Sequence, residues 1–347
     1  MSEVRQDRTS GRWVIIAPER ARRPSGLQLA GKSAVAARKR LPFDPDCPFC
    51  PGHEDRLPAI VAETRIDHAP GWSVRVVPNK FPALRVSEKT KRSDRHAVAK
   101  GYGFHELIIE SPRHNADLVS MTDLEIEAAV SMYRDQSEQL LKRPGIEAVV
   151  LFRNHGRRGG GSQSHPHAQV IALGFVPPGL NSLADWGHRY YVDKGRCPTC
   201  DEILIESDDK SRVIENGDDF VVLVPFAAER PCEIWIVPKQ HQASFFELNE
   251  SQCREFAFLL RRTLRRLLRA REDPPYNFVI DSAARAQLQS PSLHWRLRIA
   301  PDLTTWGGFE LGAGMAINPS MPEDDAELLR AAECEALDRN SGGHGAT

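Results

Sequence analysis

The sequence predicts an α+β protein made of two similar units that follow one another along the chain. Three observations lead to this prediction. A Cys-x-x-Cys pair followed by two widely spaced histidines occurs once in each half of the 347 residues. Runs of apolar and β-branched residues indicate strands after each pair, and a long helical pattern follows in both halves. A repeated order of motifs and elements indicates duplication of one structural unit.

The spacing of these motifs supports duplication over chance. The interval from the last cysteine to the first histidine is 64 residues in the first half and 41 in the second. The interval between the two histidines is 51 and 53 residues. Two long intervals that agree so closely predict that the segments between the histidines fold alike.

Strand and helix signals also repeat in the same order. Residues 122–125 (TDLE) place a threonine and a glutamate at the spacing of a capping box, directly before a helical pattern. Residues 249–251 (NES) precede the second helical pattern in the same way. Strands are expected over residues 105–110, 147–154, 165–169, 233–237, 276–281 and 294–298, and helices over 125–143 and 252–272.

The join between the two units is expected near Pro177-Pro178-Gly179, because adjacent prolines and a glycine interrupt regular structure. We therefore predict an N-terminal domain over residues 1–180 and a C-terminal domain over residues 181–347. The arginines within residues 261–271 recur at helical spacing among leucines, which indicates a solvated helix face.

Composition restricts the class of protein. Lys and Arg number 46 and Asp and Glu number 47, for a formal net charge of -1. This balance gives no overall attraction to nucleic acid or to an anionic membrane. The first residues lack the apolar stretch of a secretion signal, and no later segment approaches the roughly 20 apolar residues of a membrane span. We expect a soluble cytoplasmic protein that binds neither nucleic acid nor membrane.

Two metal sites are predicted from the cysteine pairs and their histidines. Zinc favours four Cys or His ligands in a tetrahedron, and a Cys-x-x-Cys pair lets two sulfurs reach one ion from a single turn. Both sets are closed, so we expect two structural zinc ions per chain, with iron as the alternative at the second site. The ligand sets are Cys47, Cys50, His114 and His165, and Cys197, Cys200, His241 and His294.

A candidate nucleophile lies two residues from a predicted ligand. Alternate residues of a strand face one side, so His165, His167 and Gln169 are expected to line up. A neutral imidazole is a good nucleophile toward phosphorus near neutral pH. The preceding glycine-rich segment, residues 154–162 (NHGRRGGGS), offers main-chain N–H groups and the Ser162 hydroxyl to phosphate oxygens.

The segment HPHAQ resembles the active-site motif of the galactose-1-phosphate uridylyltransferase family, in the histidine-triad superfamily, and the resemblance covers nearly the whole chain. Residues 17–24 (APERARRP) resemble its arginine motif, residues 77–82 (VPNKFP) its nucleoside-contacting segment, and residues 305–310 (TWGGFE) its stretch near the sugar. The resemblance implies two tandem histidine-triad-like domains, with antiparallel sheets flanked by helices in a split-barrel-like unit. It also implies a homodimer with active sites at the subunit interface.

The resemblance further implies a nucleotidyltransferase of carbohydrate metabolism, specifically of galactose metabolism. His167 would take UMP from UDP-glucose as a covalent intermediate and pass it to galactose 1-phosphate, while Gln169 and Ser162 hold the phosphoryl oxygens. Only the first domain would be catalytic, because Arg296 stands in the second where His167 stands in the first. The residues implied for substrate binding are Arg20, Arg23, Asn79, Asn154, Gly161 and Glu310.

Two departures from the family pattern leave the substrate open. Gly161 stands where the family has a serine or cysteine contact, and residues 311–318 (LGAGMAIN) lack the glutamine that contacts the sugar phosphate. The second metal set resembles that of ADP-sugar phosphorylases, in which inorganic phosphate accepts the adenylyl group. The alternatives are therefore an ADP-sugar phosphorylase that uses the same histidine, a zinc-dependent nucleotide-binding module without turnover, and a zinc-ribbon module for nucleic acid.

Overall fold

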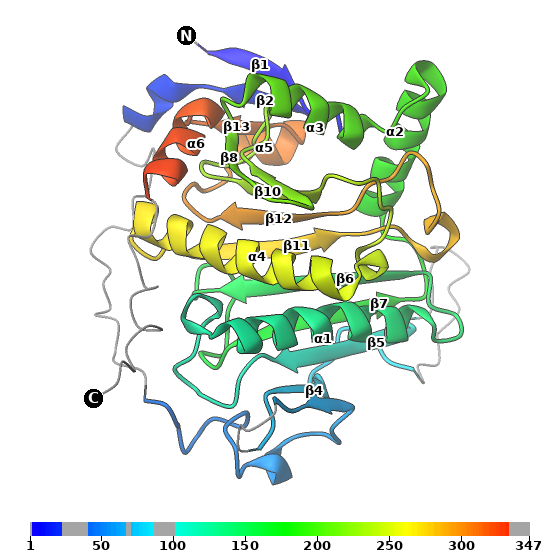
Figure 1. Ribbon diagram of the computed structural model, residues 1–347, viewed down its shortest axis with the longest axis vertical. Helices are drawn as coiled ribbons and strands as arrows, with labels where there is room; N and C mark the ends of the chain where they lie inside the picture. The colour runs from blue at the N-terminus through cyan, green and yellow to red at the C-terminus, as the bar shows by residue number, and fades with distance from the viewer. Residues whose placement is uncertain (1, 23–40, 67–70, 87–100, 333–347) are drawn as a thin grey trace, which may run out of the picture.

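The computed structural model describes residues 2–22, 41–66, 71–86 and 101–332. A ten-stranded sheet runs through this structure, and helices flank it (Figure 1). All neighbouring strands in this sheet are antiparallel. Its order is β3 (Ala62–Thr64), β4 (Val74–Pro78), β5 (Gly103–Ile109), β7 (His167–Leu173), β6 (Ala148–His155), β11 (Tyr276–Asp281), β12 (Arg296–Pro301), β10 (Ile234–Pro238), β9 (Phe220–Leu223) and β8 (Val213–Asn216).

The strand order shows the duplication directly. Read from one edge, the first half of the sheet is β3-β4-β5-β7-β6, and read from the other edge the second half is β8-β9-β10-β12-β11. The two halves meet where β6 pairs with β11, with Asn154 opposite Asn277. The α+β class with large antiparallel sheets is confirmed, and the boundary at 180/181 stays a prediction.

Helices α1 (Asp123–Leu141) and α4 (Glu250–Arg271) lie side by side on one face of the sheet (Figure 1). Thr122 caps α1 by the predicted capping box with Glu125, and Asn249 caps α4 by the same arrangement with Gln252. The apolar faces of both helices and one face of the sheet form a single core, in which Trp295 is completely buried. Among the helices described, none combines the length and apolar character that a bilayer crossing requires.

A smaller sheet joins the two ends of the described chain. Its order is β1 (Glu3–Gln6), β2 (Trp13–Ile16) and β13 (Ala316–Asn318), and β13 runs parallel to β2. The remaining helices are α2 (Pro178–Lys194), α3 (Pro198–Asp209), α5 (Gly308–Ala313) and α6 (Pro322–Ala331).

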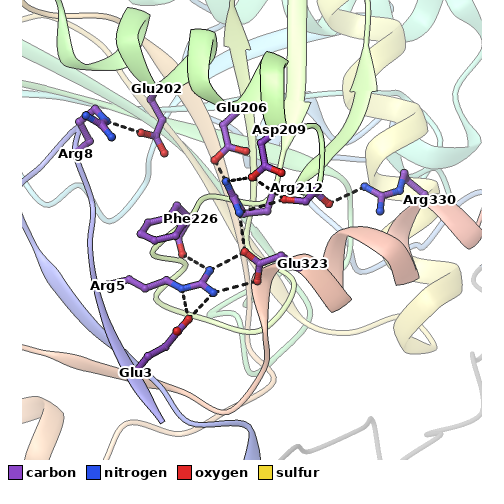
Figure 2. A network of polar contacts seen from close by, with 11 residues as sticks. Glu3, Arg5, Arg8, Glu202, Glu206, Asp209, Arg212, Phe226, Glu323 and Arg330 are labelled. Atoms are coloured by element: carbon purple, nitrogen blue, oxygen red, sulfur yellow. Dashed lines mark hydrogen bonds and ion pairs between the residues drawn. The ribbon is translucent and has the colours of Figure 1, made fainter. Parts of the chain in front are cut away.

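Figure 2 shows the polar network that connects β1, α3 and α6. The carboxylate of Glu323 on α6 accepts from Arg5 at 2.9 Å and from Arg212 at 2.7 Å. Arg212 also donates to Glu206 of α3 at 2.9 Å. These contacts fix the N-terminal strand against the last described helix.

Two expected strands begin later than predicted. β7 starts at His167 and β12 at Arg296, so His165 and His294 precede the strands that they were expected to open. Pro166 has no N–H to donate to a neighbouring strand, and the N–H of Trp295 donates to the carbonyl of Gln242 in a loop. The alternation of side chains therefore applies to His167 and Gln169 but does not include His165.

Candidate active site

Four predicted metal ligands from three segments of the chain converge near the start of β7. The ligand atoms of Cys47, Cys50, His114 and His165 all lie within 4.8 Å of one another. The Sγ–Nδ1 distance is 3.6 Å both from Cys47 to His165 and from Cys50 to His114. Ordinary zinc bond lengths in a tetrahedron give a sulfur–nitrogen edge of about 3.5 Å. The set therefore fits a tetrahedral ion.

The other nitrogen of each histidine has its own partner. His165 Nε2 donates to the main-chain oxygen of Ser111 at 2.8 Å, and His114 Nε2 lies 2.9 Å from the hydroxyl of Ser164. A carbonyl only accepts, so the proton of His165 resides on Nε2 and the lone pair of Nδ1 faces the cysteines. This outer contact selects the tautomer that a metal requires.

The second predicted set converges in the same manner. Cys200 Sγ lies 3.4 Å from His241 Nδ1 and 3.5 Å from His294 Nδ1, and Cys197 completes the group. His294 Nε2 donates to the oxygen of Pro238 at 2.9 Å. Both predicted groups are confirmed as sets of residues that could hold a metal ion.

His167, the first residue of β7, lies close to the first metal group. Its Nδ1 is 2.9 Å from the main-chain oxygen of His165, so Nδ1 donates and the lone pair is on Nε2. The ring is only 7% exposed, and Phe49 packs against it with ring centroids 5.7 Å apart. Burial lowers the pKa of His167, and the positive charge of Arg153 adds to this effect. Such a ring is neutral and nucleophilic at pH 7.

A cavity of about 710 Å³ opens beside His167. Its volume lies within the range of small-molecule and cofactor sites. The end of β6, the glycine-rich loop and the start of β7 form its walls. The structure thus brings together five predicted site residues, Asn154, Gly161, Ser162, His165 and His167, and the lining also includes Asp117 and Gly160.

The glycine-rich loop follows β6 and needs its glycines. A Cβ atom on Gly159 would lie 2.4 Å from the oxygen of His155 and 2.9 Å from that of Tyr276. Gly160 has a φ of +84°, in the left-handed region that other residues rarely adopt. Close packing of main chain on main chain therefore sets the shape of this cavity wall.

Charged residues form a paired cluster at one side of the cavity. Arg153 donates to Glu110 at 3.0 Å and to Asp117 at 3.2 Å. Burial disfavours the charged form of Asp117, but Arg153 and His155 outweigh burial and lower its pKa. Burial likewise opposes the charge on His155, while Asp117 and Asp273 raise its pKa. Because Arg153 is buried and paired, it is not an exposed cation for a nucleic acid.

Other predicted binding residues lie outside this cavity. The described lining includes neither Arg20, Asn79 nor Glu310. Arg20 belongs to a 3₁₀ helix over Pro18–Arg22, and Glu310 accepts from the N–H of Gly307 at the start of α5. Arg23 lies outside the described residues. Gln169 shares the face of β7 with His167 and contacts a histidine of β5.

Sequence reasoning missed two residues that contact the predicted site. His105 of β5 lies 2.9 Å from Gln169, and Asn277 of β11 lies 2.8 Å from Asn154. Both stand within segments that the sequence identified as strands, at positions whose side chains share a face with a site residue. A polar residue in an otherwise apolar strand was the available signal.

Comparison with known proteins identifies the family. Residues 1–177 match the family described as "Galactose-1-phosphate uridyl transferase, N-terminal domain". The chain is also 34% identical over 334 residues to the ADP-glucose phosphorylase of Arabidopsis thaliana, an alignment that covers 94% of this chain and 92% of the other. The chain belongs to the galactose-1-phosphate uridyl transferase family. The resemblance inferred from the motifs is confirmed.

Further comparisons cover nearly the whole length of this uridyl transferase family member. The galactose-1-phosphate uridylyltransferase of Thermotoga maritima is 26% identical, and the alignment covers 96% of this chain and all of the other. A crystal structure of the Arabidopsis thaliana ADP-glucose phosphorylase with bound ADP-glucose superposes with a TM-score of 0.81 at 35% identity. That superposition covers 95% of this chain and 98% of the other.

The second half of this uridyl transferase family member has no imidazole at the position of His167. Arg296 opens β12 there, and it donates to Asp281 at 3.3 Å and to the hydroxyl of Thr9. Its guanidinium carbon lies 3.8 Å from the centroid of the Trp235 ring. A buried cation paired with a carboxylate and packed on an aromatic ring thus occupies the position that the nucleophile takes in the first half.

Proposed function

We propose that this chain transfers UMP from UDP-glucose to galactose 1-phosphate, as a UDP-glucose—hexose-1-phosphate uridylyltransferase, through a covalent nucleotidyl-His167 intermediate. One observation carries the proposal. The contact between His167 Nδ1 and the oxygen of His165 leaves the Nε2 lone pair free on a ring that lines a cavity of suitable volume. The family and the uridylyltransferase relatives support the same reaction.

The reaction proceeds in two steps that share one site. Nε2 of His167 attacks the α-phosphorus of UDP-glucose, a P–N bond forms, and the P–O bond to glucose 1-phosphate breaks with its electron pair on the leaving phosphate. A phosphate oxygen of galactose 1-phosphate then attacks the same phosphorus and the P–N bond breaks, which releases UDP-galactose. Ser162, Gln169 and the loop N–H groups would stabilise the phosphoryl oxygens in both steps.

The metal groups would have a structural role. We propose zinc at both sites, with iron as the alternative at the second. When bound at the first site, zinc supplies a rigid anchor for the ring of His165. Residues of this chain then carry out the chemistry. The main-chain oxygen of His165 orients the ring of His167 for it.

The residues outside the cavity suggest an assembly. Since neither Arg20 nor Glu310 lines the described cavity of its own chain, we propose a homodimer in which they complete the partner's site. Asn154 and Gly161, which line the cavity, would contact the nucleotide within one chain. Asn79, outside the described lining, would contact the nucleoside, and Arg23 would join Arg20. We further propose residues 1–180 as the catalytic domain, residues 181–347 as the non-catalytic domain, and a cytoplasmic location.

A second candidate function is phosphorolysis of an ADP-sugar. Sequence identity favours this second function, because the chain is 34% identical to an ADP-glucose phosphorylase but 26% identical to the uridylyltransferase of Thermotoga maritima. The same histidine would accept AMP from ADP-glucose, and inorganic phosphate would receive it. The two candidates differ in base and acceptor but share the covalent step.

Radiolabelled nucleotide sugars test the proposal. The purified protein is mixed with UDP-glucose or ADP-glucose labelled in the α-phosphate, and the protein is examined for acid-labile, base-stable label. UDP-glucose should label the wild type but not His167→Gly, and the label should leave on addition of galactose 1-phosphate. The exposed His188→Ala on α2 is the control and should label fully.

Label from ADP-glucose alone, discharged by inorganic phosphate, would establish the second candidate. Absence of label from either compound, with His167→Gly equal to wild type in turnover, would refute the covalent mechanism itself.

A further inference from the structure

Two carboxamides flank His167, and their orientation matters for the reaction. Gln169 lies two residues along β7, and Asn154 at the end of β6 lines the cavity. A carboxamide presents either its oxygen or its NH₂ group, and only the NH₂ group donates hydrogen bonds to phosphate oxygens. An oxygen directed at a phosphoryl group would repel it. The orientation of each amide must therefore be fixed by a neighbour.

Asn277 fixes the amide of Asn154. Its Nδ2 lies 2.6 Å from the main-chain oxygen of Gly159, which can only accept, so this atom is the nitrogen. The same Nδ2 lies 2.8 Å from Asn154 Oδ1 and donates its second proton there. Asn154 must accept through its oxygen, and its own NH₂ group is left for the cavity. Asn277 thus contacts both the glycine-rich loop, at Gly159, and the amide of Asn154.

His105 fixes the amide of Gln169 by similar logic. The main-chain N–H of Ala83 points at His105 Nδ1 across 3.2 Å, so Nδ1 carries a lone pair. The proton of the ring is then on Nε2, which lies 2.9 Å from Gln169 Oε1. Gln169 accepts through its oxygen, and its NH₂ group is left to donate. The contact is diagonal across the β5–β7 pairing, where His105 pairs with Ile171 and Leu107 with Gln169.

Asn79 lies near the same nitrogen without changing this assignment. Its Oδ1 accepts from the N–H of Phe81 at 2.9 Å, so its Nδ2 faces His105 Nε2 at 3.2 Å. A nitrogen that carries a proton cannot accept from an amide, so this contact is not a hydrogen bond.

We propose that His105 and Asn277 are positioning residues that turn the amides of Gln169 and Asn154 so that NH₂ groups face the transferred phosphoryl group. This inference rests on the proposed function, because it concerns the negative charge on the oxygens of the transferred phosphoryl group. His105 acts through the amide of Gln169, whereas Asn277 acts through the amide of Asn154 and also donates to the main-chain oxygen of Gly159. Asn277 comes from the second half of the sheet, which gives the non-catalytic repeat a part in the reaction.

Double-mutant cycles test the pairing. The rate of label transfer from UDP-glucose to His167 is measured in single turnover for His105→Ala, Gln169→Ala, Asn277→Ala, Asn154→Ala and their pairs. Each single variant should slow transfer on the order of tenfold to a hundredfold, as expected for a misplaced donor. The double variants His105/Gln169 and Asn277/Asn154 should transfer label no more slowly than the slower of their two single variants. In the crossed pairs, such as His105/Asn154, the fold reductions in transfer rate of the two single variants should multiply.

Two further variants separate positioning from damage to the fold. His105→Gln retains a donor for Gln169 and should recover most of the rate, whereas His105→Asn is too short and should not. Glu106→Gln is the matched control, because Glu106 lies on the opposite face of β5 and contacts Gln136 of α1. It should leave the transfer rate unchanged. Multiplicative losses in the matched pairs, or equal coupling in matched and crossed pairs, would overturn the proposal.

A spectroscopic measurement keeps this inference separate from the proposed function. Nitrogen-15 NMR of the wild-type protein should show the His105 imidazole as the Nε2–H tautomer. The Nδ1–H tautomer would overturn the role of His105 whatever reaction the protein catalyses. If neither nucleotide sugar labels the wild type, the proposed function fails and the claim of phosphoryl positioning fails with it.

Discussion

His167 Nδ1 donates to the main-chain oxygen of His165 across 2.9 Å. The ring of His165 belongs to the first metal group, while its carbonyl sets the tautomer of the nucleophile. One residue therefore connects metal binding to the chemistry through a single peptide unit. A movement of the metal loop of even 1 Å would misdirect the imidazole, since the reaction requires close alignment.

Removal of one ligand should therefore affect both metal content and transfer. Cys47→Ser should reduce the metal content from about two ions per chain to about one, because a closed four-ligand site binds poorly with three ligands. Label transfer to His167 should slow by about tenfold or more. Elemental analysis and the single-turnover rate measure these effects. Cys253→Ser, a buried cysteine outside both groups, should retain both ions, and an unchanged metal content in Cys47→Ser would contradict the site.

Asp117 should make folding sensitive to acid. Burial raises the pKa of Asp117, but the charge of Arg153 and the hydrogen bond from His155 lower it by more. The folded pKa therefore lies below the unfolded value of about 3.9. The folded state then binds fewer protons, so the stabilisation is fully present above about pH 4 and is lost progressively as the pH falls from there through the lower folded pKa. Asp117→Asn should lose on the order of 2 kcal/mol of unfolding free energy at pH 7.

The difference between wild type and Asp117→Asn should shrink as the pH falls from 5 to 3. Urea unfolding across this range measures it. The exposed Asp193→Asn on α2 serves as the control and should match wild type at each pH. A difference that stays constant with pH would show that the carboxylate charge is not the cause.

The loop glycine at position 159 should not tolerate a side chain. Gly159→Ala would place Cβ against two main-chain oxygens that have no freedom to move, so we expect a loss of about 1–3 kcal/mol and slower label transfer. Gly179→Ala on α2 is the matched control, because its Cβ meets no atom within 4 Å and alanine favours a helix. Equal thermal stability of the two variants would contradict the packing argument.

Loss of Arg212, the central cation of the polar network in Figure 2, should destabilise the fold. Arg212→Met leaves Glu206 completely buried without its partner, and about 3–5 kcal/mol of stability should be lost at pH 8. Burial raises the pKa of Glu206 to about 7 even with Arg212 present, so the carboxylate of the variant takes up a proton at pH 5 and the loss becomes smaller.

Chemical denaturation at pH 5 and pH 8 measures this dependence. Arg254→Met removes an exposed ion pair of 3.3 Å with Glu127 and should cost at most about 1 kcal/mol at either pH. Similar losses in the two variants would rule out burial as the reason for the effect.

Local patterns predicted much of this protein because they reflect local physics. The capping box of Thr122 and Glu125 depends on a spacing of three residues, and the structure forms it as predicted. The interval between ligand histidines revealed the duplication, because each interval contains one long helix followed by one strand. The start of β7 was misplaced by two residues, since proline interrupts pairing regardless of the alternation around it.

The sequence by itself determined the α+β class, the duplicated plan, the two ligand sets and the identity of the candidate nucleophile. Only the tertiary structure decided the orientation of the groups around that nucleophile. Partners that turn the two amides lie far from them along the chain, His105 being 64 residues from Gln169 and Asn277 being 123 residues from Asn154. A hydrogen bond depends on distance in space, and strand pairing between the two halves is what brings those atoms together.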